Sequence, residues 1–262
     1  MKKHLITLAL LATASSAFAQ DYYYWTGAAL DSDYQNPANW VNWIGGGPAS
    51  QSPPSNDWSL NVILTEATSP ATKTIVNTPW GHRCRSLFME DSGWEMAAAL
   101  QIMNMTSRGV GTNMVNGQFQ TLNNPTHHGV WTVESGNTFV THGVYNGSYD
   151  GGVTLTGGGT VHVKGRNEGW GSEKYWSIHD ALLRVDDTQP INRTEGGPYG
   201  TVYMSHKDAR LQYISTVGNA KSHFGWLVLN NYKPDYNLVA KDIGDGYVEV
   251  SFAPPATLFF LQ

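Results

Sequence analysis

The chain has 262 residues and a net charge of −5, with 12% aromatic and only 14% charged side chains. The aromatic content excludes an intrinsically disordered chain, and the 28 glycines follow no three-residue period, which excludes a collagen-like one. Because an acidic surface repels nucleic-acid phosphates, we expect no nucleic-acid partner.

The first 19 residues have the three parts of a secretory signal peptide. A basic start at 2–4 precedes an apolar run at 5–14, and Ala-Phe-Ala at 17–19 fits a cleavage site. The alternative, a membrane anchor, needs about 20 apolar residues, and this run is shorter. We therefore expect a mature chain that starts at Gln20, has no transmembrane segment and lies in the periplasm, on the cell surface or outside the cell. Its net charge would be −7, since 14 Lys and Arg then stand against 21 Asp and Glu.

Residues 20–58 form an aromatic-rich opening, which we expect to cap the N-terminal end of the fold. Its last part, 45–55, is rich in Gly, Pro and Ser, which is typical of irregular backbone. The aromatic side chains of the segment are Tyr22, Tyr23, Tyr24, Trp25, Tyr34, Trp40, Trp43 and Trp58.

From residue 59 to 262 the chain consists of short runs in which apolar and polar residues alternate, as in strands with one buried face. In the clearest example, two such runs flank the glycines at 157–159. We expect Val153, Leu155, Val161 and Val163 to point into the core, and Thr154, Thr156, His162 and Lys164 to point outward. Similar runs occur at 60–64, 130–134, 138–141, 182–185, 201–205, 211–215, 226–229 and 247–252.

Helical patterns are scarce, and only residues 94–103 could form a helix. Met96, Leu100 and Met103 fit helical spacing, but Met96, Ala98, Leu100 and Ile102 also fit alternation, so both interpretations stay open. The scarcity of crossover helices disfavours a doubly wound α/β fold. A sandwich, a barrel and a parallel β-solenoid remain.

Short motifs follow one another in a recognisable order near the N-terminus: Trp25-Thr26-Gly27, Asn36-Pro37-Ala38-Asn39-Trp40, Pro54, Asp57 and Val62-Ile63-Leu64. Farther along, residues 155–163 have the form Leu-Thr-Gly-x-Gly-Thr-Val-x-Val. In these features the chain resembles secreted bacterial β-helix proteins of the autotransporter-passenger type, which carry autotransporter-associated β-strand repeats. The resemblance covers 25–64 and, more loosely, 130–164. It implies an all-β fold, a right-handed parallel β-helix with an aromatic N-terminal cap; the alternative is an antiparallel β-sandwich.

Cys84 is the only cysteine, so no internal disulfide can stabilise the chain. A small buried apolar residue is the simplest role for it. The competing role is a nucleophile activated by His82, which would share one face of a strand with Cys84.

Residues 165–180 are the least strand-like part of the second half, and long loops of this kind are often functional. An aromatic ring can stack on the apolar face of a sugar while charged and amide groups bind its hydroxyls. We therefore take Arg166, Glu168, Trp170, Tyr175 and Trp176 as candidate ligand-binding residues. The competing interpretation is that the two tryptophans are buried.

Glycoside hydrolysis needs two carboxylates at a defined separation. Candidates are Glu168, Glu173, Asp180, Asp186 and Asp187. The Asp186-Asp187 pair is similar to the paired aspartates of β-helix polygalacturonases, but the N-x-D and R-x-K elements of those enzymes are missing. We therefore favour an exported, non-catalytic protein that binds polysaccharide or cell-surface components, or has a structural role. The alternative is a glycoside hydrolase or polysaccharide lyase on the same scaffold.

No pattern predicts a metal or a cofactor. His127 and His128 are adjacent and would point to opposite faces of a strand, and there is no H-E-x-x-H motif. The acidic residues at 242–249 do not match a calcium-binding loop. Neither a phosphate-binding glycine loop before a helix nor a G-x-S-x-G motif is present.

Overall fold

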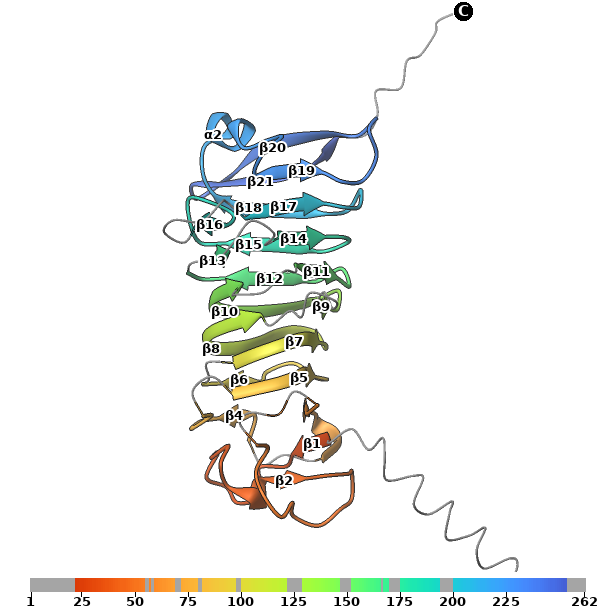
Figure 1. Ribbon diagram of the computed structural model, residues 1–262, viewed down its shortest axis with the longest axis vertical. Coiled ribbons are helices and arrows are strands. Elements are labelled where there is room, and N and C mark those ends of the chain that lie inside the picture. The colour runs from red at the N-terminus through yellow and green to blue at the C-terminus, as the bar shows by residue number, and fades with distance from the viewer. Residues whose placement is uncertain are drawn as a thin grey trace, which may run out of the picture.

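The computed structural model describes residues 22–54, 57, 59–68, 72–79, 82–97, 100–121, 129–146, 152–165, 167–169, 175–193 and 200–253. Over these ranges the protein is an elongated coil of short, mostly parallel strands with almost no helix (Figure 1). The strands are stacked one above another along the long axis. The predicted all-β parallel solenoid is therefore confirmed, and the antiparallel sandwich is not the fold of this chain.

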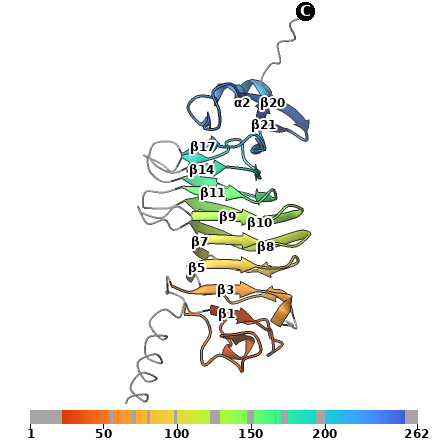
Figure 2. The same cartoon turned by 90° about the vertical axis from the view of Figure 1, so that its right-hand side faces the viewer.

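The strands form three stacks, and one turn of the chain, which we call a rung, adds a strand to a stack. The first stack, seen side-on in Figure 2, pairs its members in parallel. Its members are β1 (Tyr22–Trp25), β3 (Asn61–Leu64), β5 (His82–Met89), β7 (Leu100–Ser107), β9 (Gly129–Val133), β11 (Val153–Thr156), β14 (Tyr175–Ile178), β17 (Thr201–Met204) and β19 (Val228–Asn230).

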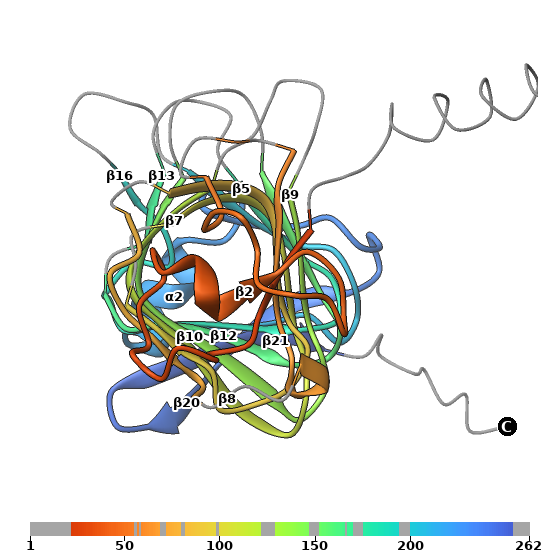
Figure 3. The same cartoon turned by 90° about the horizontal axis from the view of Figure 1, so that it is seen from below.

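The second and third stacks complete each rung. The second contains β4 (Thr74–Ile75), β6 (Glu95–Met96), β8 (Gly111–Thr121), β10 (Asn137–Asn146), β12 (Thr160–Val163), β15 (Leu182–Val185) and β18 (Arg210–Ile214). The third contains the first residues of β5 and β7, the last residues of β8 and β10, then β13 (Asn167–Gly169) and β16 (Asn192–Arg193). Viewed along the axis, the three stacks enclose a single core (Figure 3).

Alternation decides which side chains fill that core. Val153, Leu155, Val161 and Val163 are all 0% exposed. Thr154, Thr156 and His162 are half-buried and Lys164 is exposed, so the predicted inward and outward faces of β11 and β12 are confirmed. Inward positions of successive rungs then lie above one another, which buries a continuous apolar column.

The possible helix at 94–103 is wrong. Its described residues, 94–97 and 100–103, include β6 and the start of β7, with Met96, Leu100 and Ile102 buried and Met103 only half-buried. The alternating interpretation of the same residues was correct, because pairing with β5 and β8 supplies the strand hydrogen bonds that a helix would otherwise make internally.

The glycine run between β11 and β12 lets consecutive rungs approach closely. Gly157 and Gly158 have φ of +100° and +77°, in the left-handed region that favours glycine. A Cβ on Gly157 would lie 2.5 Å from the carbonyl oxygen of Val133, and one on Gly159 would lie 2.4 Å from that of Glu134. Larger residues at 157 and 159 would therefore push the turn away from the rung below.

Aromatic side chains close the N-terminal end. The rings of Trp25 and Tyr34 lie edge-on to Trp40 at centroid distances of 5.0 and 4.9 Å, and all three are 0% exposed. The Trp40 indole donates to the carbonyl of Tyr34 at 2.8 Å. A short 3-10 turn, η1 (Pro37–Asn39), leads into β2 (Trp40–Val41), which pairs antiparallel with β1. β1 itself pairs parallel with β3, so the opening segment supplies both a rung strand and the cap.

Strand pairing closes the C-terminal end. β20 (Asn237–Gly244) and β21 (Tyr247–Ala253) form an antiparallel hairpin, and β21 pairs antiparallel with β18. The one α-helix in the described residues, α2 (Val217–Ser222), lies at the same end (Figure 1). A second 3-10 turn, η2 (Glu66–Thr68), follows β3 in the chain. Within the described part of the chain, no helix is long and apolar enough to cross a membrane. The predicted signal peptide at 1–19 lies outside the described residues.

Candidate functional site

The residues predicted from the 165–180 segment are divided by the structure. Arg166 and Trp170 lie outside the described residues, and for Glu168 only the backbone, in β13, is described. Trp176 lies in β14, is 0% exposed and packs edge-on against Trp131 at 5.4 Å. A buried ring offers no face to a ligand, so Trp176 belongs to the core and not to a binding surface.

Tyr175, the neighbour of Trp176, points to the outer face and begins a group of side chains that we call the outer strip. Tyr175 pairs in register with Thr201, and Ser177 pairs with Tyr203, so β14 and β17 present their outward residues side by side. The outer strip consists of Tyr175, Ser177, His179, Tyr203, Ser205, His206 and Tyr232.

Like side chains of the outer strip meet across the two rungs. The rings of Tyr175 and Tyr203 lie 5.3 Å apart and edge-on, and the hydroxyls of Ser177 and Ser205 are 2.8 Å apart. The imidazoles of His179 and His206 stack at 4.6 Å with an interplanar angle of 14°. The strip is therefore an ordered surface with aromatic, hydroxyl and imidazole groups at fixed spacings.

The strip continues beyond the strands and rests closely on the rung below. His206 lies 5.7 Å from the ring of Tyr232, which in turn contacts Tyr236 and Phe252 at 5.1 and 5.8 Å. On the other side, a Cβ on Gly152 would lie 2.2 Å from the Tyr175 ring, so this glycine makes room for it. Burial, followed by the neighbouring Tyr203, raises the pKa of Tyr175.

The two histidines of the strip are not arranged as a metal site. A metal binds an imidazole through a nitrogen lone pair that lies in the plane of the ring. Because the two rings are stacked and nearly parallel, their lone pairs cannot converge on one ion. Their acidic neighbours are Asp180, 3.8 Å from His179 Nδ1, and Asp208, 3.5 Å from His206 Nδ1. Among the described residues, no group of three or more His, Cys, Asp or Glu side chains could hold a metal ion.

Asp186, one of the predicted catalytic candidates, is part of a network on the outer face of the second stack. Its Oδ1 lies 2.8 Å from His162 Nε2 and accepts a hydrogen bond of 2.6 Å from the Tyr247 hydroxyl. The Arg184 guanidinium lies over the Tyr247 ring at 4.2 Å. Burial raises the pKa of Asp186, but the hydrogen bonds from Tyr247 and His162 outweigh it and hold this pKa below its ordinary value. The carboxylate therefore links the C-terminal hairpin to the solenoid.

Two other candidate carboxylates accept hydrogen bonds from backbone N–H groups. Asp187 accepts the N–H of Thr188 at 2.6 Å, and Asp180 accepts that of Gly157 at 2.8 Å. The side chains of Glu168 and Glu173 lie outside the described residues.

Cys84 has the buried apolar role expected from the sequence. It is 1% exposed, and burial raises the pKa of its thiol to about 12, which keeps it protonated. His82 shares the inward face of β5, but its Nε2 lies 2.8 Å from the Tyr34 hydroxyl. An activated thiol is therefore not present.

Of the seven members of the strip, only Tyr175 was a candidate from the sequence. The other six were missed: Ser177, His179, Tyr203, Ser205, His206 and Tyr232. The signal was available in part, since alternation in 201–205 places Tyr203 and Ser205 on the outer face. Their partners on β14 lie about one rung earlier in the chain, and no local pattern specifies that register.

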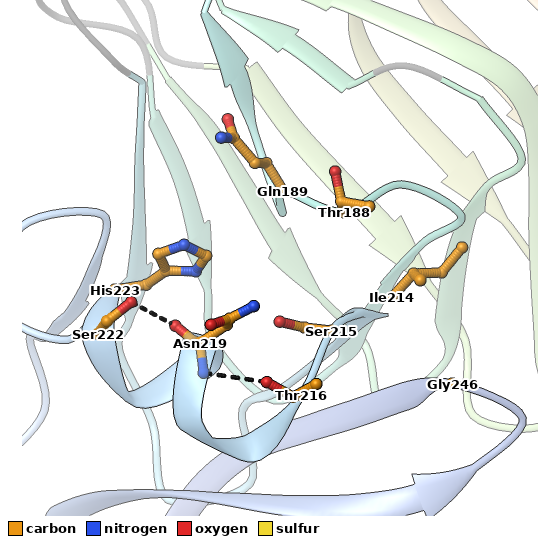
Figure 4. Close-up of a pocket in the computed structure, with 9 residues that line it drawn as sticks. All are labelled: Thr188, Gln189, Ile214, Ser215, Thr216, Asn219, Ser222, His223 and Gly246. Carbon is orange, nitrogen blue, oxygen red and sulfur yellow. Dashed lines mark hydrogen bonds between the residues drawn. The ribbon is translucent and has the colours of Figure 1, made fainter.

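A hollow at the C-terminal end is the second feature that could accommodate a ligand. It encloses about 590 Å³ between the loop after β15, the end of β18, α2 and the turn of the β20–β21 hairpin (Figure 4).

Comparisons with known proteins do not assign the chain to a family. No family model matches the chain, and no curated protein or solved structure is similar enough to indicate a relationship.

Proposed function

We propose that the protein is an exported, non-catalytic β-solenoid that binds polysaccharide along the outer strip. The observation that carries this proposal is the ordered alternation of tyrosine, serine and histidine side chains across two neighbouring rungs.

The chemistry of the strip suits a sugar polymer. Tyrosine rings provide apolar faces for stacking, while serine hydroxyls and imidazole nitrogens provide donors and acceptors for sugar hydroxyls. Stacked strands lie about 4.8 Å apart, which is close to the length of one sugar residue in an extended chain. A polymer that follows the solenoid axis would therefore meet one strand for each sugar unit.

Export is part of the same proposal. The predicted signal peptide at 1–19 supports it, and so does the resemblance to secreted β-helix proteins of the autotransporter-passenger type. Trp170, Arg166 and Glu168 remain candidate contributors, because they belong to the segment that precedes Tyr175 in the sequence.

A binding assay with the mature chain, residues 20–262, tests the proposal. Affinity electrophoresis against a panel of neutral and acidic polysaccharides should retard the wild-type protein in at least one gel. Tyr203→Ala and Tyr175→Ala should each weaken that binding about tenfold, the loss expected for one stacking contact. Trp170→Ala in the same assay decides whether this ring contributes.

Tyr24→Ala is the matched control, since Tyr24 is a half-buried tyrosine of the same stack at the opposite end of the solenoid. It should bind as wild type. Retained binding in both strip variants, or no retardation by any polysaccharide, would contradict the proposal. Release of sugar fragments that Glu168→Gln or Asp187→Asn abolishes would replace it with the enzymatic alternative.

A further inference from the structure

The hollow at the C-terminal end has a mixed, uncharged lining, in which the apolar side chain of Ile214 lies among polar groups. Its lining includes the hydroxyls of Thr188, Ser215 and Ser222, the carboxamides of Gln189 and Asn219, and the imidazole of His223 (Figure 4). No Asp, Glu, Lys or Arg lines it. Burial lowers the pKa of His223, so this side chain is neutral at pH 7.

His223 is held in place from behind. Its Nδ1 lies 2.9 Å from the Tyr213 hydroxyl, and the two rings stack at 5.8 Å. Burial raises the pKa of Tyr213, so the phenol stays protonated and adds no charge. The second ring nitrogen of His223 makes no hydrogen bond within the described residues and can serve a ligand.

The carboxamides that line the hollow also have unused hydrogen-bonding groups. The side chains of Gln189 and Asn219 make no hydrogen bonds with the part of the chain that the structure describes. The backbone of Asn219, in contrast, is fixed, because its N–H donates to the Thr216 hydroxyl and its carbonyl accepts from Ser222. Each carboxamide therefore offers donors and acceptors for sugar hydroxyls, and that of Asn219 does so from a fixed backbone.

An exposed aromatic ring lies next to the hollow. Trp226 is 46% exposed, and its ring is edge-on to His223 at 5.6 Å. Its indole N–H donates to the carbonyl of Ser222 at 2.6 Å, which fixes the ring relative to α2. An apolar face thus adjoins the group of neutral hydrogen-bonding side chains.

We infer that this hollow is a second binding site, which takes an uncharged mono- or disaccharide unit. Its volume lies within the roughly 300–1,000 Å³ of small-molecule sites. The absence of lining charges disfavours uronates and amino sugars, because a charged ligand would lose hydration without gaining an ion pair. The inference does not depend on the outer strip, because no residue that lines the hollow belongs to the strip.

Saturation-transfer NMR and calorimetry on the mature chain test this inference. The probes are maltose, cellobiose, lactose and mannobiose, with glucuronate and glucosamine as charged counterparts. At least one neutral disaccharide should bind in the millimolar range, more tightly than either charged sugar. Asn219→Ala and Gln189→Ala should each weaken that binding about fivefold, the loss expected for one or two hydrogen bonds.

Control variants separate this site from the strip and from folding defects. Lys221→Ala changes an exposed residue of α2 that does not line the hollow, and should bind as wild type. Tyr203→Ala should leave disaccharide binding unchanged. Asn219→Ala should leave polysaccharide binding by the outer strip unchanged. Asn219→Asp keeps the shape of the side chain and should also lose binding. Failure of every neutral probe to bind, tighter binding of a charged sugar, or wild-type binding in both carboxamide variants would overturn the inference.

Discussion

The two ends of the solenoid are closed by different means. At the N-terminal end, Trp25, Tyr34 and Trp40 are fully buried and cover the core with rings. At the C-terminal end, β21 pairs with β18, so the last strand of the second stack is satisfied by backbone hydrogen bonds. Aromatic side chains such as Tyr232 and Trp226 therefore remain partly exposed there. The difference shows that buried rings such as Trp40 close one end, while backbone pairing at the other end leaves rings such as Trp226 on the surface.

The largest expected effect comes from breaking the N-terminal cap. Trp40→Ala removes a fully buried ring that contacts both Trp25 and Tyr34, and should lower the free energy of unfolding by about 3–5 kcal/mol. Trp43→Ala, three residues away, removes a ring that is 65% exposed and should cost less than about 0.5 kcal/mol. Urea denaturation of the two variants measures the contrast. Equal losses would show that the cap does not depend on the buried cluster.

The N-terminal end should also make stability sensitive to acid. His82 is 0% exposed, and burial lowers its pKa to about 4, against about 6.5 when unfolded. Below pH 6.5 the His82 imidazole is protonated in the unfolded chain but stays neutral in the folded one. The free energy of unfolding therefore falls until about pH 4 and then levels off. The loss should be about 3–4 kcal/mol.

His82→Gln should remove most of this dependence between pH 7 and 4, measured by urea denaturation at several pH values. His223→Gln is the comparison from the other end. Because His223 is only half-buried, its replacement should change the slope less. A wild-type slope in His82→Gln would assign the acid sensitivity to other groups.

A smaller effect on stability should follow from removing a hydrogen bond that joins the C-terminal hairpin to the solenoid. Tyr247→Phe removes the hydrogen bond to Asp186, which joins residues 61 apart in the sequence, and should cost about 1 kcal/mol at pH 7. Because the pKa of Asp186 is lowered by folding, its contribution is present above about pH 4 and is lost as the pH falls through the folded value.

The difference between wild type and Tyr247→Phe should therefore shrink below pH 4. Thermal unfolding at pH 7 and pH 3 measures it. Tyr236→Phe, whose hydroxyl makes no hydrogen bond within the described residues, is the control and should unfold as wild type at both pH values. A pH-independent loss in Tyr247→Phe would mean that the contact does not depend on the charge of Asp186.

The sequence alone determined the strand class and the faces of individual strands. Alternation at 153–163 placed four apolar side chains in the core correctly, and the aromatic opening was recognised as a cap. These features are local, because successive side chains of a strand point to opposite sides whatever its neighbours are. The same rule applies to residues 94–103. Their alternating pattern predicted strands, which pair with adjacent rungs, and their helical spacing did not produce a helix.

Only the tertiary structure decided which residues meet. In Tyr175-Trp176 the sequence could not say which ring faces outward, since the segment before it has no readable alternation. Pairing of β14 with β11 and β17 fixed that register, buried Trp176 and brought His179 against His206. The hollow likewise joins residues 188, 219, 223 and 246 from separate segments. The physical reason is that contacts between rungs depend on the length of each intervening turn, which side-chain periodicity does not encode.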